Sequence, residues 1–168
     1  MQISSNGLSI LKNREKLRLN AYPDSNGTIT IGWGFTTYEN GAKVKKGDSI
    51  TESRAIQLLN FHLNIAVTGV NKAITTTLTQ GQFDACVSFA YNTGVGAFTG
   101  STLRKLINAD PNNTTAIFAA WRQWKYETIN GVKVVSDGLI NRREEEILMY
   151  RGVGAIVAVK KKTGLSQL

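Results

Sequence analysis

Apolar residues recur at helical spacing over most of the chain, and the clearest of these patterns begins at residue 51. Thr51 is suited to cap a helix in which Ile56, Leu59, Leu63 and Ala66 follow one another by three or four positions. This spacing places the four side chains on one face, which we expect to pack against the rest of the protein.

The segment after Thr79 is the one that we expect to be most deeply buried. Thr79 and Gln82 have the spacing of a capping box, in which each side chain bonds the other residue's backbone N–H. One stripe of the predicted helix is apolar or aromatic: Phe83, Cys86, Val87, Ala90 and Tyr91. Three further helices are predicted over residues 101–109, 114–124 and 137–150.

Residues 20–50 have a different pattern, rich in Gly, Asn, Asp, Ser and Thr. After the turn signal at residues 24–27, polar and apolar side chains alternate over residues 28–31, which predicts strands and turns. Because alternate side chains point to opposite faces, we expect Thr30 to face the cleft if Ile29 and Ile31 enter the core. Residues 4–19, which precede this region, again have helical spacing.

The order of helix, small sheet and several helices predicts the α+β class, with a small sheet lobe and a larger helical lobe on either side of a cleft. At 168 residues the chain has the size of one domain. We expect a single domain at 1–168, with the first helix and sheet lobe over about 1–50 and the helical lobe over about 51–151. Residues 152–168 form a tail to which the sequence gives no role.

Composition and charge exclude several classes of protein. The single cysteine, Cys86, excludes a disulfide scaffold, and neither it nor the single histidine, His62, has the spacing of a zinc site, so we expect no metal and no cofactor. The start lacks the apolar core of a signal peptide, and the apolar run 153–159 is shorter than the ~20 residues that span a bilayer. We therefore expect no membrane anchor. The net charge of +8 attracts anionic partners of any kind, and no nucleic-acid recognition motif accompanies it.

Two acidic residues, Glu15 and Asp24, lie at the predicted junction of helix and sheet. A carboxylic acid, a second carboxylate and the hydroxyl of Thr30 in one cleft suit the cleavage of a glycosidic bond. Glu15 would be the general acid, Asp24 would remain ionised, and Thr30 would hold a water molecule or the carboxylate. The alternatives are an ordinary surface ion pair for Glu15 and a turn-forming role for Asp24.

The run from Glu15 to Gly34 resembles the signature of phage-type lysozymes, glycoside hydrolase family 24, E-G-x-R-x-x-x-Y-x-D-x-x-G-x-x-T-I-G-x-G. Residues 82–94 and 138–146 are similar to further segments of the lambdoid-phage endolysins. The chain departs from the pattern at Lys16, where most relatives carry Gly, and at Phe35, where most carry His. The resemblance implies a lysozyme-like fold and a catalytic triad of Glu15, Asp24 and Thr30.

The resemblance also implies an activity: inverting hydrolysis of the β-1,4 bond between N-acetylmuramic acid and N-acetylglucosamine in peptidoglycan. It suggests substrate contacts by Trp33, Phe35, Asn92 and Arg142, while a helix C-cap remains open for Asn92. Arg142 either reaches the catalytic Glu15, where its charge would favour the ionised acid, or is a surface charge.

The access route and oligomeric state follow from the same resemblance. A monomer held in the host cytoplasm would need a holin or another membrane-permeabilising factor to reach the cell wall. The rival interpretation is a non-enzymatic peptidoglycan- or protein-binding module on the same fold. The intact carboxylates at Glu15 and Asp24 and the hydroxyl of Thr30 argue against that rival.

Overall fold

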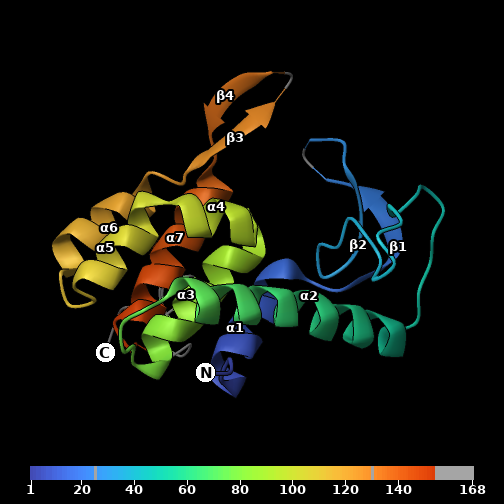
Figure 1. The fold of residues 1–168 in the computed structure, drawn as a ribbon. Helices are drawn as coiled ribbons and strands as arrows, with labels where there is room; N and C mark the ends of the chain where they lie inside the picture. The colour runs from blue at the N-terminus through green and yellow to red at the C-terminus, as the bar shows by residue number, and fades with distance from the viewer. Residues whose placement is uncertain (25, 130, 154–168) are drawn as a thin grey trace, which may run out of the picture.

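A computed structural model describes residues 1–24, 26–129 and 131–153. Over these residues the chain contains seven helices and two antiparallel two-stranded sheets, arranged as a helical lobe and a smaller sheet lobe (Figure 1). The elements in chain order are α1 (Ser5–Glu15), β1 (Arg18–Pro23), β2 (Ile29–Gly32), α2 (Glu52–Ala73), α3 (Gln80–Thr93), α4 (Val95–Gly100), α5 (Thr102–Ala109), α6 (Thr114–Arg122), β3 (Tyr126–Ile129), β4 (Val132–Val135) and α7 (Asp137–Tyr150). The predicted α+β class is confirmed.

Helix α3 lies at the centre of the helical lobe. The capping box forms, because the Thr79 hydroxyl accepts from the backbone N–H of Gln82 and the Gln82 side chain accepts from that of Thr79. Every residue from 82 to 90 is buried, since α1, α2, α4 and α7 all pack against this helix. The rings of Phe98 and Trp121 meet Phe89 edge-on and fix its position in the core.

Helix α2 runs from the sheet lobe to the helical lobe (Figure 1). Its 22 residues span about 33 Å at the usual rise per residue. Thr51 caps it by accepting from the N–H of Arg54, and Leu59, Leu63 and Ala66 are buried as predicted. Ile56 is instead 41% exposed, because Ala55, Leu58 and Leu59 form the buried face at this end of α2 and Ile56 lies off that face.

The first helix ends at Glu15, whereas its apolar spacing predicts a helix as far as residue 19. Lys16 follows with a φ of 43°, and the chain turns there into β1. Leu19 therefore lies in a strand, where its carbonyl accepts from the N–H of Ile50. Strand pairing has overridden a helical pattern that local residues alone would have continued.

Residues 126–129 and 132–135 belong to the part of the chain predicted to be mostly helical, but they form strands. This segment is a hairpin in which β3 and β4 pair in register from Tyr126 opposite Val135 to Ile129 opposite Val132. The hairpin projects from the helical lobe, with the sheet lobe across from it (Figure 1). Helix α6 accordingly ends at Arg122 rather than at residue 124, and α4 is a further helix that the sequence pattern did not predict.

Among the described residues, no helix is both long and apolar enough to cross a membrane. The same part of the chain contains no group of three His, Cys, Asp or Glu side chains that would hold a metal ion. Most of the predicted tail, residues 154–168, lies outside the described residues.

Candidate active site

Glu15 is the last residue of α1 and lies where the chain leaves the helical lobe. Its side chain is 19% exposed, and its Oε1 accepts a hydrogen bond from Nη1 of Arg142 on α7. A Cβ atom added to Gly34 would lie 3.0 Å from Glu15 Oε2, and Gly34 has a φ of +86°. Glycine at this position therefore leaves the space that the carboxylate occupies beside the sheet lobe.

Arg142 is buried and paired, which decides between the two interpretations of this residue in favour of contact with Glu15. Burial lowers the pKa of Arg142, but the charges of Glu15 and Glu146 and their hydrogen bonds outweigh it, so its pKa is raised overall. The guanidinium therefore remains positively charged beside the acid.

A second carboxylate, Glu146, lies behind Arg142 and is 1% exposed. It accepts hydrogen bonds from Nε1 of Trp121 at 2.8 Å, Oγ of Ser88 at 3.0 Å and Nη2 of Arg143 at 2.9 Å. Arg142 Nε lies 3.4 Å from Glu146 Oε1. Arg142 thus stands between one carboxylate at the surface of the cleft and another inside the helical lobe.

Asp24 begins the turn between β1 and β2. Its Oδ1 accepts from the backbone N–H groups of Asn26 and Thr28, both at 2.8 Å, which fixes the orientation of the carboxylate. Thr30, six residues after Asp24, is only 4% exposed, and its hydroxyl donates to the carbonyl of Tyr22 at 3.2 Å. The alternation of side chains predicted that Thr30 faces the cleft. Its hydroxyl instead bonds the backbone of β1, and Thr30 lines neither of the two hollows described below.

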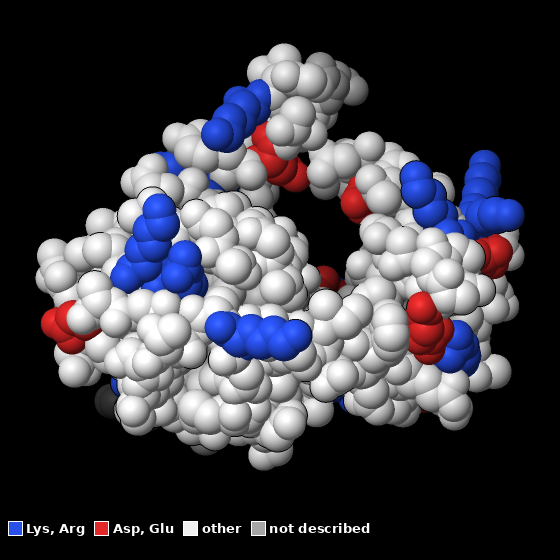
Figure 2. All heavy atoms as spheres, viewed as in Figure 1, with Lys and Arg blue, Asp and Glu red and all other residues white. Residues whose placement is uncertain are grey.

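Glu15 and Asp24 both line a hollow of about 590 Å³ between the lobes, which we call the acid hollow. Figure 2 shows an opening between the hairpin and the sheet lobe with acidic side chains on its walls. The remaining lining comes from α1, the turn after β1, the end of α3, the segment from α6 through β3, and the start of α7: Arg14, Asn26, Asn92, Thr93, Trp124, Tyr126, Glu127, Ser136, Gly138, Leu139, Arg142 and Arg143. The hollow is thus assembled from segments that are distant in the sequence.

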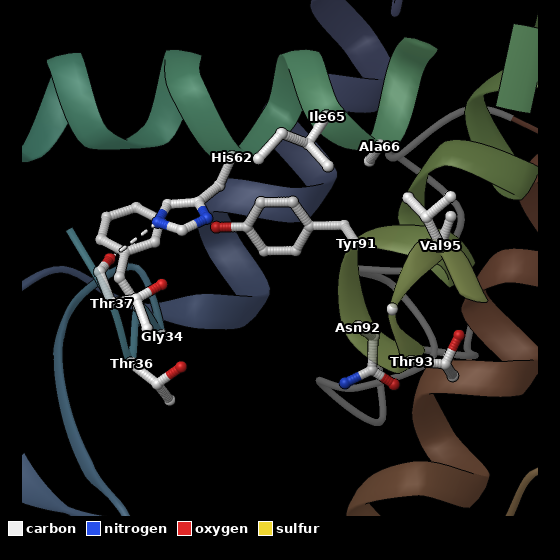
Figure 3. Close-up of a pocket in the computed structure, with 13 residues that line it drawn as sticks. Gly34, Thr36, Thr37, His62, Ile65, Ala66, Tyr91, Asn92, Thr93 and Val95 are labelled. Carbon is white, nitrogen blue, oxygen red and sulfur yellow. Dashed lines mark hydrogen bonds between the residues drawn. The ribbon is translucent and has the colours of Figure 1, made fainter. Parts of the chain in front are cut away.

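A second hollow of about 370 Å³, the side hollow, lies between α2, the end of α3 and the sheet lobe (Figure 3). Asn92 and Thr93 line both hollows, so the two adjoin at the end of α3. Tyr91 extends from α3 toward the sheet lobe, and its hydroxyl donates to the carbonyl of Trp33 at 3.0 Å. Burial, and then the charge of Glu15, raise the pKa of Tyr91, so its hydroxyl stays protonated and bridges the two lobes.

The other predicted contact residues lie in different environments. Asn92 is exposed within α3, whose C-cap is Gly94, and its Oδ1 accepts from Nη2 of Arg143 at 2.8 Å. Phe35 is 3% exposed and stacks on His62 with the ring centres 4.9 Å apart, so only an edge of it reaches the side hollow. Trp33 is 4% exposed and lines neither hollow, which corrects the expectation that it lies along the cleft.

The sequence interpretation missed the hairpin side of the acid hollow. Trp124, Tyr126, Glu127 and Ser136 line it only because the chain folds back between α6 and α7. The dipeptide at residues 130–131, Asn-Gly between runs rich in Ile, Thr and Val, was the local signal for this hairpin. Glu146 was missed because it belongs to a run of three glutamates that has the pattern of a solvated helix face.

Comparisons with known proteins agree with this architecture. The family model described as phage lysozyme matches residues 12–146. The chain is 39% identical over 153 residues to the endolysin of Bacillus phage PZA, covering 89% of this chain but 55% of that protein, so it spans about half the length of this relative.

Two solved structures superpose on most of the chain. The endolysin from Escherichia coli O157:H7 phage FAHEc1 has a TM-score of 0.81 and 43% identity, covering 89% of this chain and 93% of that one. The muramidase domain of SpmX from Asticaccaulis excentricus has a TM-score of 0.74 and 34% identity, covering 89% and 97%. Since the family model covers most of the sequence and these relatives exceed 30% identity, the chain belongs to the phage lysozyme family.

Proposed function

We propose that this chain is a lysozyme that hydrolyses, with inversion, the β-1,4 bond between N-acetylmuramic acid and N-acetylglucosamine in peptidoglycan. The observation that carries the proposal is that Glu15 and Asp24 line one hollow between the lobes. Membership of the phage lysozyme family and similarity to proteins named endolysin and muramidase domain support it.

Glu15 is the general acid in this proposal. It is partly buried at the end of α1, and Arg142 fixes the direction of its carboxyl group. In its protonated form it donates to the glycosidic oxygen, so that the bond to the anomeric carbon breaks as positive charge develops on the sugar ring.

Asp24 is the general base. It accepts a proton from the water molecule that attacks the anomeric carbon from the face opposite the leaving group, which gives inversion. The two backbone N–H groups on its Oδ1 hold it in one orientation. Thr30 is assigned a positioning role, because its hydroxyl bonds the carbonyl of Tyr22, two residues before Asp24, and so holds the strand that leads into this turn.

The glycan lies across both hollows, with the scissile bond beside Glu15. Asn92 lines both hollows and carries an amide suited to an acetamido group, so we assign it a direct sugar contact. Phe35 offers an apolar edge in the side hollow, and Trp33 acts only through the support that its backbone gives to Tyr91. Arg142 acts through Glu15 rather than as a sugar contact.

Clearing of a peptidoglycan suspension tests the activity. The wild type is expected to clear the suspension, and Glu15→Gln to lose at least about a thousandfold of the rate, because Gln cannot donate a carboxyl proton. Glu144→Gln is the matched control, since Glu144 is on α7 in an exposed ion pair with Arg122 and does not line the acid hollow. Equal clearing by the wild type and Glu15→Gln, or none by either, would refute the hydrolase.

The products test the bond and the stereochemistry. Mass spectrometry of the digest is expected to find new reducing ends on N-acetylmuramic acid, and proton NMR at early times to find the α-anomer. Binding to peptidoglycan without new reducing ends would support the non-enzymatic module instead.

We further propose that the protein acts as a monomer that stays in the host cytoplasm until a holin or another permeabilising factor admits it to the cell wall. Expression with and without a holin tests it: lysis is expected only with the holin, and lysis without any such factor would contradict it. Light scattering is expected to give the monomer mass.

A further inference from the structure

We propose that Glu146 is a positioning residue that balances the charge of Arg142 and thereby sets the proton affinity of Glu15. This inference deepens the proposed function, because it rests on Glu15 as the general acid. Glu146 does not line the acid hollow, so it acts on Glu15 through its charge and its contact with Arg142 and not by touching the substrate.

The need for such a residue follows from the contact between Arg142 and Glu15. A guanidinium beside a carboxyl group favours the ionised form, whereas a general acid must hold its proton at the pH of the reaction. Arg142 is buried, so solvent screens its charge poorly. Without a compensating negative charge, Arg142 would orient Glu15 but would also favour the ionised form, which cannot donate a proton.

The geometry supplies that negative charge on the opposite side of Arg142. Its Nη1 bonds Glu15, while its Nε lies 3.4 Å from Glu146. Arg143 lies with Nε 2.8 Å from Glu146 Oε2, so Glu146 faces both arginines. Two guanidinium groups and two carboxylates form one array with no net charge when Glu15 is ionised.

The array is held rigidly. Trp121 and Ser88 donate to the two oxygens of Glu146 from α6 and α3, which fixes the carboxylate between elements of the core. Arg143 is 1% exposed, and its guanidinium lies 4.8 Å from the centre of the Phe89 ring. Burial lowers the pKa of Arg143, and the charge of Glu146 opposes that shift. The charged side chains are therefore held in place and cannot rotate into solvent, where water would weaken their interaction.

Two other carboxylates, Asp24 and Glu127, line the acid hollow on its sheet and hairpin sides, whereas Glu146 lies behind Arg142 in the helical lobe. On the α1 side, Arg14 pairs with Glu145 of α7 at 2.8 Å. On α3, burial raises the pKa of Cys86 and of Tyr91, so both remain uncharged at neutral pH. Glu146 is the carboxylate that faces Arg142 from within the helical lobe.

The test compares Glu146→Gln with Glu144→Gln, which removes the same charge from an exposed position of the same helix. The titration of Glu15 is followed by NMR of carboxyl-labelled glutamate, with its signal identified by its loss in Glu15→Gln. In Glu146→Gln we expect the midpoint to fall by about one pH unit, and in Glu144→Gln by less than about 0.2. The basic limb of the pH–activity profile is expected to move with the midpoint.

Arg143→Gln removes a positive charge from the same array, whereas Glu146→Gln removes a negative one. This variant tests the inference on its own if Glu146→Gln does not fold. Removing this positive charge is expected to raise the midpoint of Glu15 and move the basic limb to higher pH. A midpoint in Glu146→Gln equal to that in Glu144→Gln, or a fall in Arg143→Gln, would overturn the inference. The titration is measured without substrate. If the variants shift the midpoint of Glu15 as expected but the wild type does not cleave peptidoglycan, only the proposed function is refuted.

Discussion

Lys16 carries strain that its replacement by glycine would release. It is the C-cap of α1, with φ 43° and ψ 124°, a backbone conformation that side chains with a Cβ rarely adopt. Lys16→Gly should therefore stabilise the protein although it removes a side chain.

The size of the effect follows from two opposing terms. Strain at such a backbone conformation costs about 1–3 kcal/mol, and glycine loses about 0.5–1 kcal/mol more conformational entropy on folding than a residue with a side chain. The difference gives a net gain of about 1 kcal/mol. For a chain of 168 residues this corresponds to a rise in Tm of about 2–4 °C.

Thermal unfolding followed by circular dichroism measures this rise. Lys16→Ala is the matched control, because it removes the same charge and the same exposed side chain but keeps the Cβ, and it is expected to leave Tm within about 1 °C of the wild type. If Lys16→Gly melts no higher than Lys16→Ala, the strain argument is wrong.

Two further changes test the site and its support. Gly34→Ala places a Cβ 3.0 Å from Glu15 Oε2 at a φ of +86°, so kcat for peptidoglycan should fall by about ten- to a hundredfold with a smaller change in KM, and an unchanged kcat would contradict the close approach. The pKa of Asp48 lies below its ordinary value because the Lys45 backbone N–H and the Tyr38 hydroxyl donate to it. Asp48 therefore stabilises the fold above its unfolded-state pKa of 3.8, and this contribution is lost as the pH falls through the lower folded-state value. Urea unfolding at several pH values should show a shallower acid loss in Asp48→Asn, and an identical loss would refute this account.

Much of the helical lobe follows from local sequence. Two helix starts can be identified from local residues alone. Thr79 and Gln82 form the capping box of α3, and the Ser136 side chain caps α7. Leu19 shows where such reasoning stops, since the helical pattern that includes it ends at Glu15, and the strand carbonyl of Leu19 pairs with the distant Ile50. Pairing between segments decides the boundary there.

The candidate site divides in the same way. Glu15 and Asp24 were predictable because they belong to one continuous motif, and both line the same hollow. Trp33 lies within the same motif, but its burial depends on the packing of α1, from which Lys12 extends over its ring. The partners of Arg142 come from α1 and α7, and the donors to Glu146 include α3 and α6, so no single window of sequence contains that network.

The pairing of Glu15 with Arg142 has a consequence during synthesis, since the two residues are 127 positions apart. A nascent chain that has not yet emerged as far as α7 contains the acid but neither the arginine that orients it nor the carboxylate behind that arginine. Helix α1 also docks through Ser4 on Asp84, 80 positions later. Translation thus delivers the parts of the acid's environment in a fixed order and completes it with the last helix described.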